Sequence, residues 1–276
     1  MKPLVIITVL LFTLTSCYNR YNNVSVTEPV KSSVHELVHI PSSKEMKKIE
    51  GGSYLGFIGK DSGRIVTVDS FLIDDSPVTV SEYLEFLKKN PQWTKSHINR
   101  LYADNDYLHN WEGDFEIPKN VDPNSPVTNI SWFAARAYAR SVGKRLPTID
   151  EWEYVGLADE QTKDASSKPE FTEFILNSYQ NKKTYENPIK ADKPNYYGVY
   201  DMYGMVWEWT SDFNSVMITG ESRNDSATNE TLFCSGAAVT TSDLKNYAAF
   251  IRFAMRGSLK ADYTVNNLGF RCAKDI

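Results

Sequence analysis

The sequence contains three cysteines, Cys17, Cys234 and Cys272, whose thiols could bind a metal, form a disulfide or carry a lipid. Soft thiolates are good ligands for copper(I), so Cys234 and Cys272 could bind that ion if they are reduced and close in space. A disulfide between them is the alternative. The export signal described below favours the disulfide, because an exported chain meets an oxidising compartment and Cys17 has another role.

Histidine adds little further chemistry. His35 and His39 have the i, i+4 spacing that suits a metal site on a helix, but Pro41 and the lack of other ligands indicate a solvated linker. The remaining histidines are His97 and His109. The sequence shows no pattern typical of a Ser/His/Asp catalytic triad, so a hydrolase site is not expected. It also lacks a glycine-rich phosphate-binding loop, so a nucleotide site is not expected.

The first residues indicate export from a bacterial cell. Residues 1–3 are basic, and the apolar run at 4–14 is too short to span a bilayer permanently but fits the core of a secretory signal. The following Leu14-Thr15-Ser16-Cys17 resembles the lipobox of bacterial lipoproteins, in which the cysteine becomes the lipid-bearing N-terminus. We therefore expect a signal peptide at 1–16 and an acylated Cys17 that holds the chain on a lipid bilayer.

Residues 17–45 form the second predicted segment, a lipid anchor and flexible tether, because they are polar and show no apolar periodicity. Tyr18 follows the lipidated position, where an aspartate often signals inner-membrane retention in enteric bacteria. The absence of that aspartate favours the outer membrane. The expected location is therefore the bacterial cell envelope.

Residues 46–276 suffice for one domain with a sizeable core. The full sequence has a net charge of −5, and aromatic residues make up 13% of it. The sequence has no basic stripe, so nucleic acid is not an expected partner. Short aromatic stretches between Gly and Asn turns, with little helical periodicity, indicate an irregular α+β domain.

The first part of this domain has clear element signals. We expect a strand, a glycine turn and a second strand over 46–56. A further strand is expected over 65–73, where hydrophobic and polar residues alternate. Apolar residues at helical spacing predict a helix over 80–89, with Thr79 or Ser81 as its cap.

Two further helices have capping signals. Ser131 precedes a predicted helix that runs to Ser141 and ends at Gly143. Thr148-Ile149-Asp150-Glu151 has the spacing of a capping box and starts another helix. The aromatic insert that precedes them, at 90–120, is expected to be a loop that packs on the domain.

The second half of the domain has weaker signals. Residues 156–194 are predicted to hold a helix and long loops, and 196–200 a strand and a turn. Val206-Trp207-Glu208-Trp209 alternates, so its two tryptophans should face one way and its glutamate the other. The closing strand is expected over 268–273.

Four motifs in a fixed order point to a known family. They are Pro126-Val127-Thr128-Asn129-Ile130-Ser131-Trp132, Gly143-Lys144-Arg145-Leu146-Pro147-Thr148 running into Glu151-Trp152-Glu153-Tyr154, Asn195-Tyr196-Tyr197-Gly198-Val199-Tyr200-Asp201-Met202 running into Val206-Trp207-Glu208-Trp209, and Leu268-Gly269-Phe270-Arg271-Cys272-Ala273. This order resembles the formylglycine-generating enzyme family, also called sulfatase-modifying factors. The resemblance covers residues 46–276 and implies an α+β fold, a large variant of the C-type lectin fold with little regular secondary structure.

The resemblance also shows what this chain lacks. Family members that oxidise sulfatases use two cysteines, copper(I) and oxygen to convert a sulfatase cysteine into formylglycine. When their segment is placed over this chain from Arg256 backwards, those positions fall near Asp243 and Ala248, and residues 235–271 contain no cysteine. Formylglycine generation is therefore not expected, and no catalytic residue is assigned.

The calcium sites of the family are altered as well. Its enzymes usually carry Gly-Asn-Val-Trp-Glu-Trp, in which the Asn helps to hold calcium. Met205 stands at that position here, and a thioether is a poor ligand for a hard cation. Asp201 and Glu208 could still bind calcium weakly. The alternative is that both carboxylates make buried hydrogen bonds.

Two classes of function remain open, and the first is a non-catalytic binding or assembly module. The groove that holds a sulfatase peptide in the enzymes could hold a segment of another envelope protein here. The candidate binding residues are Asp243, Tyr247, Arg252, Arg256 and Asn266. The alternative role of the two arginines is pairing with buried carboxylates such as Asp201 or Glu208.

The second class is an accessory factor or metallochaperone for a copper enzyme such as nitrite reductase. The stretches 233–237 and 247–261 resemble a subfamily, some members of which are described as accessory proteins of copper nitrite reductases. This role would need reduced Cys234 and Cys272 as metal ligands. Copper is therefore expected as a cofactor only in that case, and calcium is the other candidate.

Overall fold

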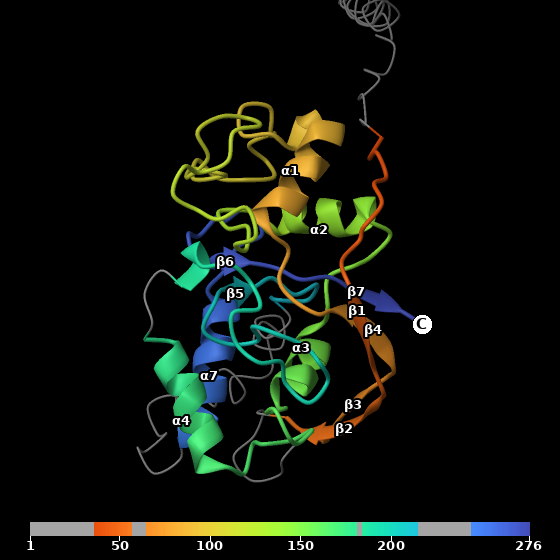
Figure 1. Ribbon diagram of the computed structural model, residues 1–276, viewed down its shortest axis with the longest axis vertical. Helices are drawn as coiled ribbons and strands as arrows, with labels where there is room; N and C mark the ends of the chain where they lie inside the picture. Colours follow the sequence, from red (N-terminus) through yellow and green to blue (C-terminus); the bar gives the residue numbers. More distant parts are fainter. Residues whose placement is uncertain (1–35, 57–64, 181–183, 215–243) are drawn as a thin grey trace, which may run out of the picture. The chain divides into compact units, whose positions relative to one another are not determined.

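The computed structural model describes four stretches of the chain, residues 36–56, 65–180, 184–214 and 244–276 (Figure 1). The predicted signal peptide, Cys17 and most of the predicted tether lie outside these stretches. No helix within them is both long enough and apolar enough to cross a membrane.

The compact unit that carries the motifs begins at Leu37, before the predicted boundary at residue 46. The backbone N–H of Val38 donates to Asn90 Oδ1 (2.8 Å), and that of Ile40 donates to the Ser141 carbonyl (2.9 Å). These bonds tie the last part of the predicted tether to the ends of two helices. Residues 37–45 are therefore part of the folded unit.

The first two sheets are built from short antiparallel strands. β4 (Phe71–Asp74) lies between β1 (Met46–Ile49) and β7 (Ala273–Asp275) in a three-stranded sheet. β2 (Gly52–Leu55) pairs with β3 (Ile65–Val68). Figure 1 shows β1 and β7 in one sheet, so segments from the two ends of the domain meet there.

The strand–turn–strand prediction for 46–56 is confirmed, whereas the single strand predicted over 65–73 is wrong. Two strands, β3 and β4, occupy this stretch and are separated by Asp69 and Ser70. Burial does alternate within β3, as expected. The chain changes its pairing partner from β2 to β1, and alternation within one segment carries no information about that change.

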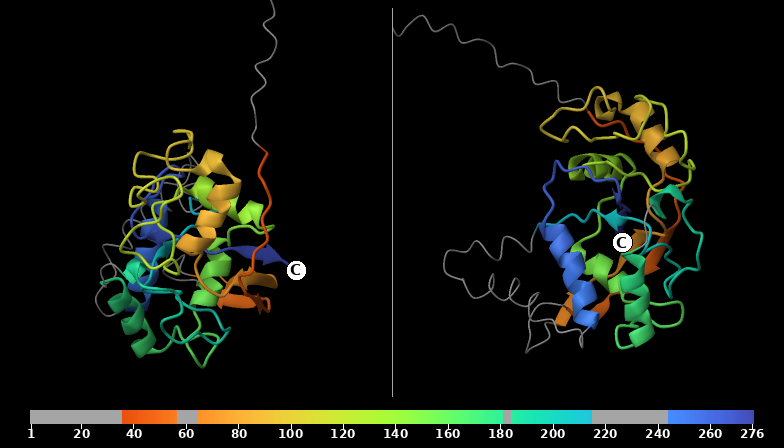
Figure 2. Two further views of the ribbon diagram at one scale, coloured as in Figure 1. Left: turned by 45° about the horizontal axis from the view of Figure 1, so that its top comes forward. Right: turned by 90° about the vertical axis from the view of Figure 1, so that its left-hand side faces the viewer.

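Helices supply most of the remaining regular structure in the described residues. They are α1 (Val80–Lys89), α2 (Trp132–Ser141), α3 (Ile149–Gly156), α4 (Pro169–Ser178) and α7 (Leu244–Gly257), with short 3-10 turns η1 (Pro91–Trp93) and η2 (Thr184–Glu186). α4 and α7 pack against each other, and both views of Figure 2 show them as neighbours.

The predicted helix starts are confirmed by their capping bonds. Thr79 Oγ1 accepts the Glu82 N–H (3.2 Å), and the Glu82 carboxylate accepts the Thr79 N–H (2.8 Å), which forms a capping box. Thr148 and Glu151 make the same reciprocal pair at the start of α3 (3.1 and 2.8 Å). Ser131 caps α2. These contacts join residues three apart, so the local sequence is sufficient to predict them.

Two motif glycines meet specific backbone requirements. Gly143 follows α2 with a φ of +70°, a conformation that favours glycine, as the predicted helix end requires. Gly269 lies in β6 (Leu268–Gly269), which pairs in parallel with β5 (Trp207–Glu208). A Cβ at Gly269 would lie 2.7 Å from the backbone oxygen of Val127, so this position allows two backbones to approach closely.

The predictions for the second half are only partly right. A helix, α4, and loops do occupy 156–194, but residues 196–200 form a turn with no strand. The stretch 268–273 contains β6 and only the first residue of β7. α7 is absent from the predicted elements, because Arg252 and Arg256 interrupt its apolar face and are themselves buried.

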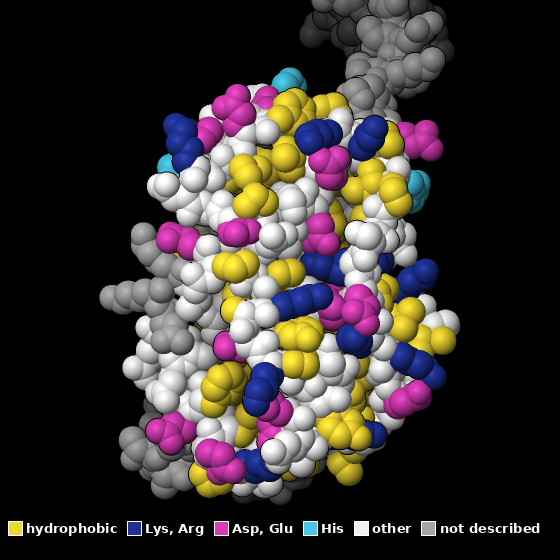
Figure 3. All heavy atoms as spheres, in the orientation of Figure 1, with side chains coloured by type: hydrophobic (Ala, Val, Ile, Leu, Met, Phe, Trp, Pro, Cys, Tyr) yellow, Lys and Arg dark blue, Asp and Glu magenta, His cyan; other side chains and the backbone are white. Residues whose placement is uncertain are grey.

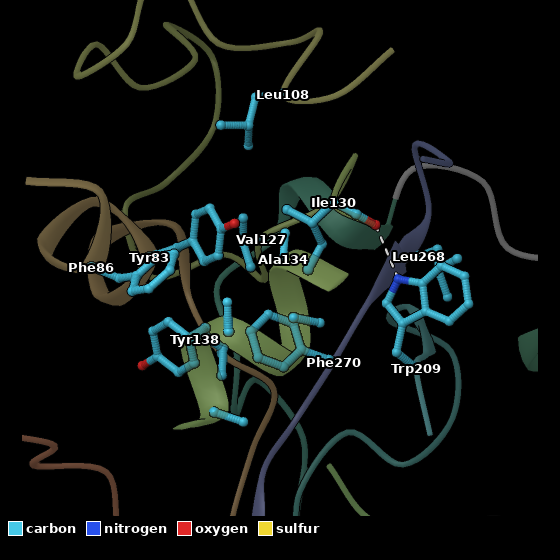
Figure 4. Close-up of a cluster of buried hydrophobic side chains, with 14 of the residues drawn as sticks. Tyr83, Phe86, Leu108, Val127, Ile130, Ala134, Tyr138, Trp209, Leu268 and Phe270 are labelled. Atoms are coloured by element: carbon cyan, nitrogen blue, oxygen red, sulfur yellow. Dashed lines mark hydrogen bonds between the residues drawn. The ribbon is translucent and has the colours of Figure 1, made fainter. Parts of the chain in front are cut away.

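The larger core lies between α1, α2 and the last motif (Figure 4). The rings of Tyr83, Tyr138 and Phe270 contact one another, with centroids 5.3 to 6.4 Å apart. Trp209 is fully buried and donates its indole N–H to the Ile130 carbonyl (3.0 Å), the bond drawn as a dashed line. Ile130, Trp209 and Phe270, from three of the four motifs, thus meet in this core with rings from α1 and α2.

The insert at 90–120 packs on this core. Tyr107 and Trp111 are each 2% exposed, and the Tyr107 hydroxyl lies 2.7 Å from that of Tyr83. The predicted packing is therefore confirmed for these two rings, although Tyr102 remains 44% exposed. Figure 2 shows the insert as yellow loops beside α1.

Charged side chains of both signs are interspersed on the face shown in Figure 3. Lys and Arg alternate with Asp and Glu, and no broad area of one sign forms on this face.

Candidate functional site

A buried cluster of charges joins α3 to α7. Glu153 on α3 accepts hydrogen bonds from Arg252 Nε and Nη2 (2.9 and 2.6 Å) and from Arg256 Nη1 (2.6 Å). The two arginines are four residues apart, so they lie on one face of α7. Pairing with a buried carboxylate is thus their observed role, but the partner is Glu153 and not Asp201 or Glu208.

The electrostatics of this cluster keep it ionised. Burial alone would raise the pKa of Glu153, but the positive charges of Arg252 and Arg256 outweigh it and lower that pKa to about 2. The guanidinium groups also lie over aromatic rings, with Arg252 5.6 Å from the Tyr203 centroid and Arg256 4.8 Å from the Trp152 centroid. Glu153 is therefore a fixed anion near neutral pH.

A second buried pair joins the last two motifs. Arg271 Nε and Nη2 donate to the two Glu208 oxygens at 2.8 to 3.0 Å, and neither side chain is exposed. The Trp152 indole N–H donates to Glu208 Oε2 (2.8 Å). Both tryptophans of the Trp-Glu-Trp motif contact the larger core. Trp207 also stacks on Tyr179, and the alternation predicted for this motif stays a prediction.

These contacts bear on the predicted calcium site. Arg271 Nη2 also donates to the Asp201 carbonyl (3.1 Å), and Asp201 Oδ2 accepts the Lys190 N–H (2.8 Å). Arg271 thus bridges Glu208 and the backbone of Asp201. Within the described residues, no group of three or more His, Cys, Asp or Glu could hold a metal ion. Calcium at these carboxylates stays a prediction, and it would require Glu208 to exchange its partners.

A cavity of about 590 Å³ lies beside both ion pairs. Arg252, Arg256 and Asn266 line it, so the structure brings together three of the five predicted binding residues. Its wall is otherwise rich in aromatic and thioether groups, among them Trp152, Tyr179, Tyr203, Trp207, Met205 and Met255. The Tyr179 and Trp207 rings stack with centroids 4.9 Å apart, which gives one side of the cavity a flat apolar surface.

The other predicted positions lie elsewhere. Tyr247 is on α7 and 43% exposed but does not line this cavity, and Asp243 lies outside the described residues. Ala248, near which the second cysteine of the enzymes aligns, is buried and borders a separate cavity of about 300 Å³. A methyl group there cannot replace a thiolate.

Glu153 is the central site residue that the sequence patterns missed, although a signal for it exists. Helical periodicity places it on the buried face of α3 with Ile149 and Gly156. A carboxylate on such a face needs a buried cation as its partner. Arg252, within the largely apolar stretch 247–255, and Arg256, directly after it, supply that cation.

Cys272 is fully buried, and burial raises the pKa of its thiol, with the nearby Asp74 charge acting in the same direction. Its backbone N–H donates to Asp74 Oδ2 (3.0 Å). Cys234 lies outside the described residues. The disulfide and the copper site that involve both cysteines therefore stay predictions.

Known proteins resemble this chain over most of its length. The family model described as "Sulfatase-modifying factor enzyme 1-like domain" matches residues 18–276. The formylglycine-generating enzyme of Streptomyces coelicolor is 35% identical over 170 residues, which cover 55% of this chain and 54% of that enzyme. The chain thus aligns with about half of the length of that relative.

Two further similarities cover more of the chain. The inactive C-alpha-formylglycine-generating enzyme 2 of Bos taurus is 30% identical over 254 residues, or 78% of this chain and 80% of that protein. The solved structure of PvdO from Pseudomonas aeruginosa matches with a TM-score of 0.46 and 20% identity, and the match covers 84% of this chain and 95% of that one.

Proposed function

The chain belongs to the sulfatase-modifying factor enzyme 1-like domain family, and from this premise we infer that it is a non-catalytic binding module of the bacterial cell envelope. It has the α+β fold of that family, with little regular secondary structure. The similarity to the inactive C-alpha-formylglycine-generating enzyme 2 of Bos taurus is compatible with a role without catalysis. The lipobox-like residues 14–17 support attachment to a membrane through Cys17.

The observation that carries this proposal is the composition of the 590 Å³ cavity. Among the residues that the structure describes, its lining contains no cysteine and no histidine, and both of its arginines are bound to Glu153. Because the pKa of Glu153 is held at about 2, this carboxylate is a poor general base near neutral pH. The cavity offers a shaped surface without the thiol pair that the oxidising enzymes use.

The remaining lining groups suit a protein ligand. Aromatic rings and methionines supply large, adaptable apolar contacts at protein interfaces. Gln180 and Asn266 are exposed members of the lining and can exchange hydrogen bonds with a peptide backbone. We propose that this cavity receives a segment of another envelope protein.

Site-specific photo-crosslinking in cells tests this proposal. A photoreactive amino acid at Asn266 should capture one discrete envelope protein. The same residue at Leu101, which is 76% exposed and lies in the insert, is the control. Equal capture at both positions, or no adduct at Asn266, would count against the proposed cavity.

The absence of catalysis and the anchor need their own measurements. The purified protein, supplied with copper(I), oxygen and a sulfatase peptide, should leave the peptide cysteine unchanged by mass spectrometry, and formylglycine in the product would overturn the non-catalytic role. Cys17→Ser should abolish incorporation of labelled fatty acid and release the protein from membranes. Retention of both in that variant would refute the lipid anchor.

A further inference from the structure

Two arginines on α2 lack the carboxylate partners that others in the structure have. Arg136 and Arg140 are exposed and one helical turn apart. Within the part of the chain that the structure describes, neither side chain has a hydrogen bond or an ion pair. By contrast, the buried or half-buried arginines all pair with carboxylates, and these are Arg145, Arg252, Arg256 and Arg271.

Both exposed arginines border one cavity of about 430 Å³. The other described residues of its lining are Trp132, Arg145, Leu146 and Ser211, so the described lining holds three guanidinium groups and no carboxylate. This cavity is distinct from the one beside α7, with which it shares no lining residue.

The aromatic ring of this cavity is fixed from two sides. The Trp132 indole N–H donates to the Thr210 carbonyl (2.9 Å), and Phe213 packs against the ring with centroids 6.1 Å apart. Arg136 lies 5.2 Å from the Trp132 ring centroid. A cation–π contact positions this guanidinium without using its N–H donors, so they remain available for a ligand.

Arg145 also lines this cavity, but its guanidinium group is already paired with carboxylates. Its Nη1 and Nη2 donate to the two Glu151 oxygens (2.7 Å each), and its Nε donates to Asp275 (2.8 Å). These two carboxylates more than offset its single positive charge. The guanidinium groups at the cavity that have no carboxylate partner are therefore those of Arg136 and Arg140.

We propose that this cavity binds a phosphate group, with Arg136 and Arg140 as its donors. The two guanidinium groups that lack carboxylate partners attract an anion, and their paired N–H groups match the oxygens of a phosphate in geometry. Trp132 and Leu146 provide apolar surface for the group that carries the phosphate.

Two sources could supply the phosphate, a soluble phosphorylated compound or a phospholipid headgroup. Both present anionic phosphate oxygens to the arginines, as a monoester or a diester, so the experiment has one arm for each. The proposal is independent of the proposed protein ligand, because it uses different residues.

Calorimetric titration of the full chain in detergent with inorganic phosphate and with glycerol 3-phosphate tests the soluble arm. Arg136→Gln combined with Arg140→Gln should weaken binding about tenfold or more. The matched control, Lys89→Gln with Arg100→Gln, removes two exposed positive charges elsewhere and should leave the affinity unchanged. Arg136→Lys with Arg140→Lys keeps the charge but loses the planar fork, and we expect intermediate binding.

Flotation of the Cys17→Ser chain with vesicles tests the lipid arm without the acyl anchor. Binding to vesicles that contain phosphatidylglycerol, but not to pure phosphatidylcholine, identifies an anionic headgroup if the Arg136→Gln, Arg140→Gln variant no longer binds those vesicles.

Saturable binding in either arm that depends on both arginines supports the site. Equal losses in the control variant would show a net-charge effect only, and no saturable binding in either arm would likewise overturn the proposal.

Discussion

Arg252 Nη2 lies 2.6 Å from Glu153 Oε2, and both side chains are buried. This contact joins α3 to α7 across 99 residues of sequence. Arg256 binds the other oxygen of the same carboxylate, so one acid fixes two successive turns of α7. Because α7 forms part of the wall of the large cavity, the position of that wall depends on Glu153.

Glu153→Gln should destabilise the fold by about 3 to 5 kcal/mol, because it leaves two buried guanidinium groups without a counter-charge. Urea unfolding measures the change in the free energy of unfolding. Glu173→Gln on the exposed side of α4 is the control and should change it by less than about 0.5 kcal/mol. If both variants unfold at the same urea concentration, the cluster does not hold α7 in place.

The same carboxylate should make stability depend on acid. In the unfolded chain Glu153 has an ordinary pKa near 4.5, and in the folded protein its pKa is about 2. Its contribution is therefore fully present above about pH 4.5 and is lost as the pH falls towards 2. Over this window the wild type should lose about 3 kcal/mol more than Glu153→Gln. Urea unfolding at a series of pH values measures the two slopes, and parallel slopes would contradict the assignment.

The helix starts and ends could be predicted from the sequence, because they depend on contacts between residues close together in the chain. The capping boxes at Thr79 and Thr148 join residues three apart, and the helices they start are present. The end of α2 at Gly143 follows from a backbone conformation that glycine adopts readily. The family motifs gave the α+β fold, and three of the five predicted binding residues do line one cavity.

The remaining features depend on contacts between distant segments. The partner change between β3 and β4 is decided by β1 and β2. α7 was not predicted because its buried arginines break the apolar pattern of the helix. Their charges are offset by Glu153, which lies on another helix. A pattern within one segment cannot reveal a partner 99 residues away.

Gly269→Ala should lower stability by about 1 to 3 kcal/mol, a range typical of overpacking. The new Cβ would lie 2.7 Å from the Val127 backbone oxygen, which cannot move aside as a flexible side chain could. Gly113→Ala is the control, because a Cβ there would meet only the Glu116 side chain at 3.5 Å or more. Thermal unfolding compares the variants, and equal melting temperatures would show that the β5–β6 backbone can adjust.

Cys272 should resist alkylation in the native protein. The residue is fully buried and the pKa of its thiol is raised, so both access and thiolate formation are disfavoured. We expect iodoacetamide to label it in reduced protein only after unfolding, as mass spectrometry of the Cys272 peptide would show. Rapid labelling of the folded, reduced protein would contradict the burial.

The same assay decides between the disulfide and the copper hypotheses. If Cys234 and Cys272 form the predicted disulfide, protein from the oxidising compartment should show no label on either cysteine when it is denatured without reductant, and label on both after reduction. Label on Cys272 without reductant would refute the disulfide.

A titration with copper(I) then becomes the discriminating step, because two reduced thiols that bind about one copper would restore the accessory role. Cys272→Ser is the control, since it should abolish such binding.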